Sequence, residues 1–399
     1  MNKISEKIKK ILTTNKNLSS IASGHKGLLL IGSSGIIGSA ISAVFWLLVA
    51  SLLSVEEYGE ISYFIAIASL GICCIVGSPQ TLTVYSTKHP KIIPTLLLLT
   101  LIFAGIGSLI AFLIVQRFEI ITLIFSFIVL EASLTLLLGK KLYSKYSKFL
   151  LTQKILQFVI GISLSFSLGL NGILIGIVLA NFSLIPIFYK ELRNYKIDFS
   201  LLKPKKEFII NNEVIYLISV FRRDIDKIII VPILGFTVLG NFALTLQFFA
   251  IMMIISSISF EYLLPKDVGG EKNAKLKKIL ILVSVLIALS GFFFSPYFIE
   301  NFFTKFSESI IPIQIASFCV IPSTISMILF SKILALEKSR FLIIANLVQL
   351  CAILIGTIYL GILYSIIGVT VAFILGNTIY AITLAIINYK YVGKKKFDI

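Results

Sequence analysis

Apolar stretches of about 20 residues recur along the whole chain, and each is long enough, as a helix, to cross a hydrocarbon core about 30 Å thick. Apolar side chains make up 57% of the 399 residues and charged ones only 14%. A soluble domain has roughly 25% charged residues. This composition excludes an ordinary soluble enzyme and predicts an all-α, polytopic membrane protein.

Breaks of charge, Gly, Pro and Asn divide the apolar stretches into twelve predicted transmembrane spans. These spans cover residues 28–53, 61–77, 92–115, 119–139, 149–168, 171–189, 212–234, 240–262, 279–298, 309–331, 341–360 and 364–388. Only Gln116-Arg117-Phe118 separate 92–115 from 119–139, and only two residues separate 149–168 from 171–189.

Lys and Arg residues are distributed so that they set the orientation. With the N-terminus in the cytoplasm, the inside segments carry 30 of them and the outside loops carry two, Arg117 and Lys305. Positively charged loops stay cytoplasmic, so both termini are predicted to lie in the cytoplasm. The same distribution explains the net charge of +17 without any nucleic-acid partner.

The first 27 residues form a basic segment before the first span. Ile4, Ile8, Ile11 and Leu12 follow helical spacing, with lysines between them. Two interpretations stay open: a short interfacial helix on anionic lipid headgroups, or a basic tail that only sets the topology.

The two halves of the chain show a weak repeat. At a shift of 181 residues, Leu53 falls on Leu234 and Gly59 on Gly240, at two corresponding outer turns. The sequence therefore predicts an N-terminal six-helix lobe (1–189), a basic cytoplasmic linker (190–211) and a C-terminal six-helix lobe (212–399). Two such parallel repeats around a central cavity are a transporter architecture, in which the lobes rock around a site near the bilayer midplane.

The cysteine and histidine residues show no spacing that is typical of an enzyme active site. The cysteines lie inside apolar runs without metal-ligand spacing, and the two histidines lie far apart in cytoplasmic segments; they are Cys73, Cys74, Cys319, Cys351, His25 and His89. The longest outside loop, near Asn301 to Glu308, is too short for a catalytic domain. We therefore expect no enzyme activity, no metal and no cofactor.

The seventh span carries five consecutive or nearly consecutive charges near its middle: Arg222, Arg223, Asp224, Asp226 and Lys227. Each costs about 2.5–3.5 kcal/mol if it faces lipid, so they are expected to face protein or a water-filled cavity. Helical spacing predicts Arg222–Asp226 and Asp224–Lys227 pairs, which leaves Arg223 as the unmatched cation. An unmatched Arg in a cavity suits an anionic headgroup. The alternative is that these residues only tie the seventh helix to its neighbours.

Two further charges lie within predicted spans of the first lobe. Glu131 has three open roles: proton coupling, an ion pair with an Arg of the seventh helix, or a protonated and hydrogen-bonded carboxyl. Lys154 lies close to the cytoplasmic end of its span, where it either snorkels to the interface or forms an ion pair.

Two hairpins resemble those of a known family. The first reads Leu-Ser-Val-Glu-Glu-Tyr-Gly and contains Glu57, Tyr58 and Gly59; the second runs from Asp226-Lys227-Ile-Ile-Ile to Gly240-Asn-Phe-Ala. They resemble the O-antigen (Wzx-type) flippases of the multidrug/oligosaccharidyl-lipid/polysaccharide exporter superfamily, although Phe242 stands where that family usually has Tyr. The twelve-span length and the basic linker fit the same resemblance.

The resemblance implies a bacterial inner-membrane protein that moves an undecaprenyl-diphosphate-linked oligosaccharide from the cytoplasmic to the outer leaflet. A glycan polymerase and a chain-length regulator are then candidate partners, beside the phospholipid membrane. Arg222, Arg223 and Lys227 become candidate diphosphate ligands, with Asp224 and Asp226 orienting them.

Other functions stay open. A multidrug exporter of the same superfamily would favour an acidic cavity. A lipid II flippase usually has two further C-terminal helices. A non-transporting membrane component of glycan assembly would need no charges at mid-membrane.

Overall fold

The computed structural model describes residues 30–268, 273–335 and 339–392, and every regular element in these ranges is helical. The predicted basic segment 1–27 and the basic residues after 392 lie outside the described residues. Eight described helices are long and apolar enough to cross a membrane, or nine if one bent pair counts as a single span. The prediction of an all-helical chain with many spans is confirmed, whereas the number twelve stays a prediction.

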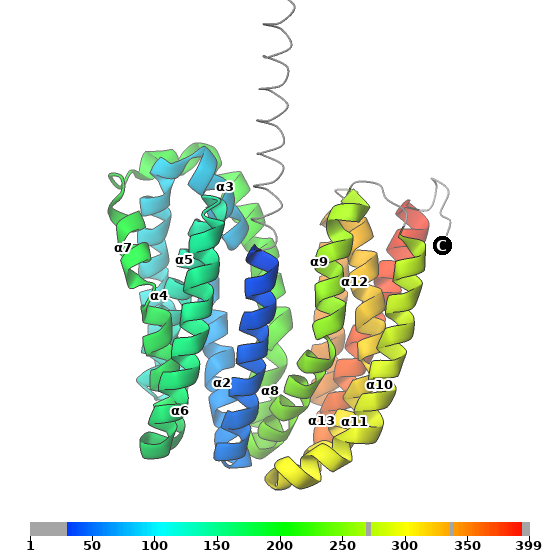
Figure 1. Ribbon diagram of the computed structural model, residues 1–399. Coiled ribbons are helices and arrows are strands. Elements are labelled where there is room, and N and C mark those ends of the chain that lie inside the picture. The colour runs from blue at the N-terminus through cyan, green and yellow to red at the C-terminus, as the bar shows by residue number, and fades with distance from the viewer. Residues whose placement is uncertain (1–29, 269–272, 336–338, 393–399) are drawn as a thin grey trace, which may run out of the picture.

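The helices form two groups that stand side by side (Figure 1). The first group contains the helix Leu30–Leu52, α2 (Val55–Gly71), α3 (Pro79–Lys88), α4 (Ile93–Val115), α5 (Glu119–Gly139), α6 (Tyr143–Phe182) and α7 (Ile185–Arg193). The second contains α9 (Ile254–Val268), α10 (Ala274–Phe302), α11 (Ile310–Phe318), α12 (Val320–Ala335) and α13 (Ser339–Ile387). Helix α8 (Lys206–Met252) packs against both α2 and α13 and joins the groups.

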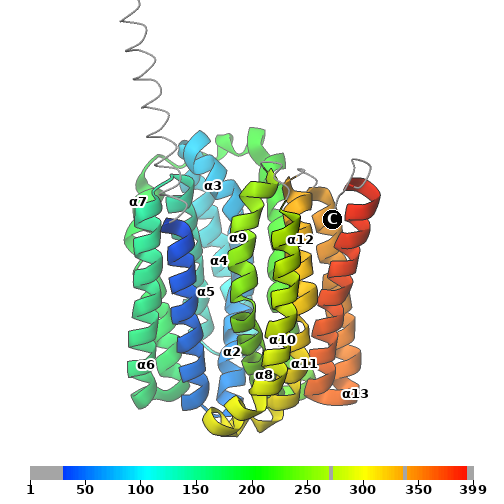
Figure 2. The ribbon, with the colours of Figure 1, turned by 45° about the vertical axis from the view of Figure 1, so that its right-hand side comes forward.

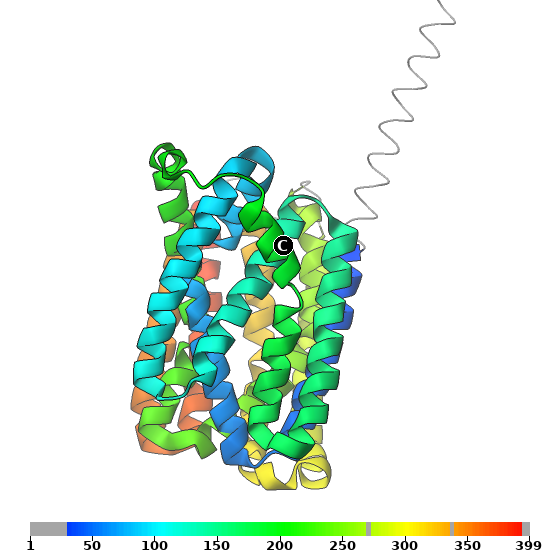
Figure 3. The same cartoon turned by 90° about the vertical axis from the view of Figure 1, so that its left-hand side faces the viewer.

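The bundle has two different ends. The N/C end, at the top of Figures 1 and 2, holds the start of the first helix and the end of α13. The hairpin end, at the bottom, holds the turn between the first helix and α2 and the short 3₁₀ helix Thr304–Ser309. At the N/C end the segment between α7 and α8 crosses over the first group (Figure 3), where the Thr95 hydroxyl donates a hydrogen bond to the Asp198 carbonyl.

Three helices are too long to cross a bilayer once. Helices α6, α8 and α13 have 40, 47 and 49 residues, and at 1.5 Å per residue each is about twice the length of a span. Each contains one residue with positive φ, namely Gly169, Gly235 and Ser365, where the helical conformation is interrupted. The predicted gaps 235–239 and 361–363 are therefore wrong in detail, since a single left-handed residue replaces each loop.

The second predicted span, 61–77, is wrong at both ends. Helix α2 begins six residues earlier because Ser54 and Glu57 form a capping box at its N-terminus. After a short 3₁₀ turn that ends at Cys74, the chain bends by 40° into α3, with Pro79 at the first helical position. The two pieces together form a broken helix.

Candidate functional site between the two helix groups

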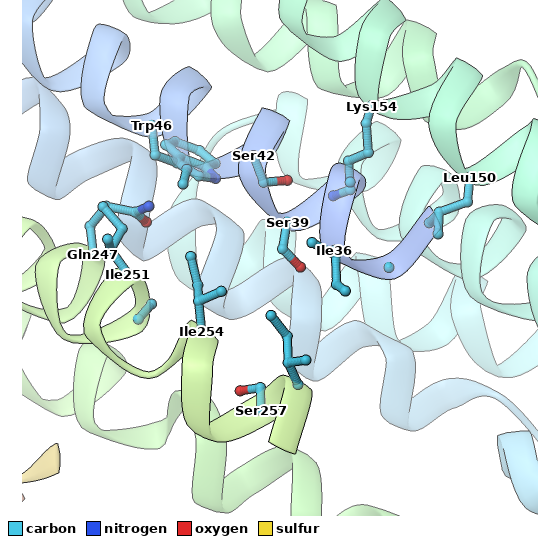
Figure 4. Close-up of a pocket in the computed structure, with 15 residues that line it drawn as sticks. Ile36, Ser39, Ser42, Trp46, Leu150, Lys154, Gln247, Ile251, Ile254 and Ser257 are labelled. Atoms are coloured by element: carbon cyan, nitrogen blue, oxygen red, sulfur yellow. The ribbon is translucent and has the colours of Figure 1, made fainter. Parts of the chain in front are cut away.

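A cavity of about 480 Å³ lies where the first helix and α6 of the first group face α8 and α9. Figure 4 shows Ser39, Ser42 and Trp46 of the first helix on one side and Gln247 and Ile254 on the other. Lys154 of α6 is the one charged residue in the described lining. The cavity is therefore an apolar and hydroxyl-lined space with a single cation, at the seam between the groups.

Lys154 has no ion pair or hydrogen bond with any residue that the structure describes, so the ion pair considered for it is not formed there. In Figure 4 its side chain extends from α6 toward the first helix, near Ser39 and Ser42. The rim of the same cavity carries the apolar side chains of Ile36 and Ile258, which are 39% and 38% exposed. An apolar rim thus surrounds an interior with an unneutralised positive charge.

The charged cluster of the seventh predicted span is centred on Asp224. Its carboxylate accepts hydrogen bonds from Arg223 Nε at 2.8 Å, from Lys227 Nζ at 2.7 Å and from the Ser69 hydroxyl of α2 at 2.5 Å. The predicted Asp224–Lys227 ion pair is confirmed. The Ser69 hydroxyl ties the buried Asp224 to α2 of the first group, whereas both cations that Asp224 holds lie on α8 itself.

The predicted Arg222–Asp226 pair is wrong. Arg222 turns toward the second group, where its Nη1 donates to Gln349 Oε1 at 2.9 Å and its guanidinium lies 5.6 Å from the centre of the Tyr380 ring. The Asp226 carboxylate accepts the Lys227 backbone N–H instead. Helix α8 lies between the two groups, so neighbouring residues on it find partners in different groups. Arg222 contacts α13 of the second group, whereas Asp224 contacts α2 of the first. Of the three cations in this cluster, Arg222, and not Arg223, is the one without an acidic partner among the described residues.

Arg223 reaches beyond its pair with Asp224. Its side chain is 60% exposed. Glu131 lines a second cavity, of about 500 Å³, together with Tyr146 of α6. No ion pair within 4.0 Å joins Glu131 to a described Arg, so that role is not seen.

The cavities around Glu131 and Lys154 open on one face of α6. Tyr146 lines the first cavity, Lys154 lines the second together with Leu150, and the three residues are spaced by four. Residues at this spacing share a helix face. Lys154 and Glu131 therefore line two cavities along this face of α6, which we together call the α6-face cleft; Arg223 is in neither described lining.

The remaining predicted site residues close the hairpin end. The Glu57 carboxylate accepts the Ser54 N–H at 2.8 Å in the capping box, and the Tyr58 ring meets Phe306 edge-on at 5.7 Å. A Cβ placed on Gly59 would lie 2.0 Å from the Phe236 carbonyl oxygen. These three residues thus begin α2 and seat it against α8 and the 3₁₀ helix.

Gly240 makes the reciprocal approach. A Cβ there would lie 2.0 Å from the Val55 carbonyl oxygen, so neither glycine tolerates a side chain. Lys305 Nζ adds a contact to the Leu53 carbonyl at 3.4 Å. Helix α8, which joins the groups, is therefore in backbone contact with α2 at the hairpin end.

Several residues of the site were not found by sequence reasoning. Gln349 and Phe306 become neighbours of Arg222 and Tyr58 only through folding, and Glu213 accepts the Gly77 and Ser78 N–H groups at the break in the second span. No local spacing signals such contacts, because the partners are far apart in sequence. No group of three metal-ligating side chains occurs among the described residues.

Solved structures with a similar fold include transporters and a flippase. The lipid II flippase MurJ in an inward closed conformation matches at TM-score 0.67 and 17% identity, covering 88% of this chain and 86% of that one. A multidrug resistance MATE family transporter of the MOP superfamily, inward-facing, matches at 0.62 and 13%, covering 92% and 99%. A MOP superfamily transporter from Pyrococcus furiosus, described as having a binding pocket of reverse polarity, matches at 0.60 and 13%, covering 93% and 97%. No family model and no curated protein matches the sequence. The fold is that of MOP superfamily transporters.

Proposed function

We propose that the protein is a flippase that carries an undecaprenyl-diphosphate-linked oligosaccharide, such as an O-antigen or similar surface-polysaccharide repeat unit, across the bacterial inner membrane. The observation that carries this proposal is the position of Lys154, an unpaired cation inside an interlobe cavity whose rim is apolar. A lipid-linked diphosphate has the complementary chemistry, because its headgroup is anionic and its tail remains in the bilayer.

The charge of the α6-face cleft supports an anionic headgroup. Lys154 has no acidic partner among the described residues, and Arg223 shares Asp224 with Lys227. An Arg suits bidentate recognition of phosphate, and a cation in a low-dielectric cavity is stabilised when an anion enters. Arg223 and Lys154 are our diphosphate ligands, with Lys227 and Asp224 orienting Arg223. Asp226 has no such contact, and Arg222 faces a different cavity.

The broken helices support the twelve-span arrangement. Dividing α6, α8 and α13 at Gly169, Gly235 and Ser365 adds three spans to the nine counted when the bent pair is one span, which gives twelve. The two groups then correspond to lobes 1–189 and 212–399, joined by the linker 190–211. With both termini in the cytoplasm, the hairpin end is the outer end, and its glycine contacts close the transporter toward the outside.

A multidrug exporter is the second candidate. Glu131 favours it, because a carboxyl without a partner among the described residues, in a cavity of about 500 Å³, suits a cationic drug or a coupling proton. The excess of cations around the cleft speaks for the flippase. A non-transporting component of glycan assembly would gain nothing from an unpaired cation at this depth.

The sidedness of lipid-linked oligosaccharide in cells that lack the protein tests the proposal. A glycan-labelling reagent that cannot cross the membrane should find less substrate on the outer face, while total lipid-linked oligosaccharide rises and surface polysaccharide is lost. Unchanged outer labelling together with greater sensitivity to cationic dyes would assign drug export instead. Purification with a polymerase or chain-length regulator would test those partners separately.

A further inference from the structure

The second helix group contains a cavity of its own, of about 380 Å³. Its walls come from α8, α9, α12 and α13, and it shares no lining residue with the interlobe cavity. Arg222 is the only charged side chain in its described lining, with Asn377, Ser323 and Ser326 as polar neighbours and three Phe and two Met side chains around them. Its size lies within the range of small-molecule sites, about 300–1,000 Å³. We call it the Arg222 cavity.

Arg222 is held in place but left unsatisfied. Gln349, which is 2% exposed, accepts one guanidinium N–H at 2.9 Å and is itself fixed by donating to Asn377 Oδ1 at 3.2 Å. The Arg222 Nε atom is buried and has no hydrogen-bond partner. A guanidinium offers five N–H donors, and a buried donor without an acceptor is costly. The side chain is therefore oriented by amides and lacks an anion.

The charge count selects the kind of anion. One guanidinium in a largely apolar cavity neutralises one negative charge, whereas a diphosphate would leave excess negative charge among Phe and Met side chains. A carboxylate matches the planar fork of Arg with two parallel hydrogen bonds. The Phe rings and the two Ser hydroxyls then suit a compact body with both apolar and hydroxyl surface.

We propose that the Arg222 cavity binds a carboxylate, supplied either by an acidic sugar of the transported glycan or by a free organic acid. In the first case the protein selects repeat units that contain a uronic acid, and the inference deepens the proposed function. The diphosphate and the carboxylate would then occupy different lobes, at Arg223 with Lys154 and at Arg222.

Calorimetric titration of the purified full chain in nanodiscs tests this assignment. The probes are glucuronate, glucose, acetate and inorganic pyrophosphate. We expect glucuronate to bind and glucose not to bind, and Arg222→Gln to weaken glucuronate binding about tenfold or more. Arg223→Gln, one residue along the same helix, should weaken pyrophosphate binding and leave glucuronate binding unchanged. Acetate that binds as tightly as glucuronate would identify a free organic acid as the ligand.

A second variant distinguishes loss of the binding site from misfolding of the protein. Met327→Trp fills the Arg222 cavity without removing a charge and should also abolish glucuronate binding, while retained pyrophosphate binding shows that either variant is folded. Failure of the wild-type chain to bind glucuronate or acetate, or equal glucuronate binding by Arg222→Gln, would overturn the carboxylate site. Failure of the proposed flippase function can be distinguished from failure of the carboxylate site, because it would abolish pyrophosphate binding and leave glucuronate binding intact.

Discussion

Gly59 of α2 and Gly240 of α8 cross backbone to backbone at the hairpin end. A Cβ on Gly59 would lie 2.9 Å from the Gly240 nitrogen, and a Cβ on Gly240 would lie 3.0 Å from the Val55 carbonyl carbon. The two residues occupy corresponding positions, 181 apart, in the predicted repeat. In the two-lobe arrangement that we propose, each lobe contributes the same kind of turn to this contact.

Opening this contact should expose the hairpin end. We expect Gly59→Val to force α2 and α8 apart, because no rotamer of Val avoids the Phe236 carbonyl. The measurement is labelling of a Ser309→Cys reporter, at a position of the same 3₁₀ helix that is 0% exposed, by a maleimide that cannot cross the membrane. Labelling should rise well above that of the reporter alone.

Gly105→Ala is the matched control, since nothing lies within 4 Å of a Cβ at this membrane-helix glycine. It should leave the labelling of the Ser309→Cys reporter unchanged. Equal labelling in the Gly59→Val and Gly105→Ala backgrounds would contradict a role for the glycine contact in closing this end.

Phe306 should anchor the closed hairpin end. Its ring is fully buried and meets Tyr58 edge-on, so Phe306→Ala should lower the free energy of unfolding by about 3–5 kcal/mol. Phe302→Ala, at a ring that is 62% exposed in the same segment, should change it by less than about 0.5 kcal/mol. Unfolding of the detergent-solubilised protein compares the two, and similar losses would place the stabilising contact elsewhere.

Asp224 should matter more for stability than Asp226. Asp224→Asn removes the buried negative charge that Arg223 and Lys227 share, and breaking a buried ion pair by removing one partner costs about 3–5 kcal/mol. Asp226 accepts one backbone N–H, so Asp226→Asn should cost less. Thermal unfolding of the two variants measures the difference. Adding Lys227→Gln to Asp224→Asn should recover part of the loss, and no recovery would argue against the ion pair as its cause.

The sequence predicted those features of the structure that depend on a single segment of the chain. The apolar runs predict the helices, and the spacing of Asp224 and Lys227 predicts their ion pair, because both depend on local geometry. The repeat at Gly59 and Gly240 marks two corresponding turns, although it does not reveal that the turns touch.

Local sequence patterns could not predict the contacts between segments that are distant in the chain. Helical spacing favours Asp226 as the partner of Arg222, yet Gln349, 127 residues away, takes that place because α8 is enclosed from both sides. The position of Lys154 near the end of its span favoured a side chain that snorkels to the interface. Only the packing of α6 beside the first helix directs that side chain into a cavity. Ser365 gave no signal as a break, since left-handed backbone is usually associated with Gly.

Headgroup translocation in proteoliposomes tests the account most directly. Vesicles would contain a fluorescent polyprenyl-diphosphate-linked sugar and either the wild-type chain, Lys154→Gln, or Lys148→Gln at an exposed lysine of the same helix. The measurement is the fraction of headgroup that becomes accessible to an external quencher. We predict rapid translocation by the wild type and Lys148→Gln, and a loss of at least about tenfold for Lys154→Gln, since a charge-assisted contact is removed. Equal translocation by all three proteins would contradict the cationic interlobe site.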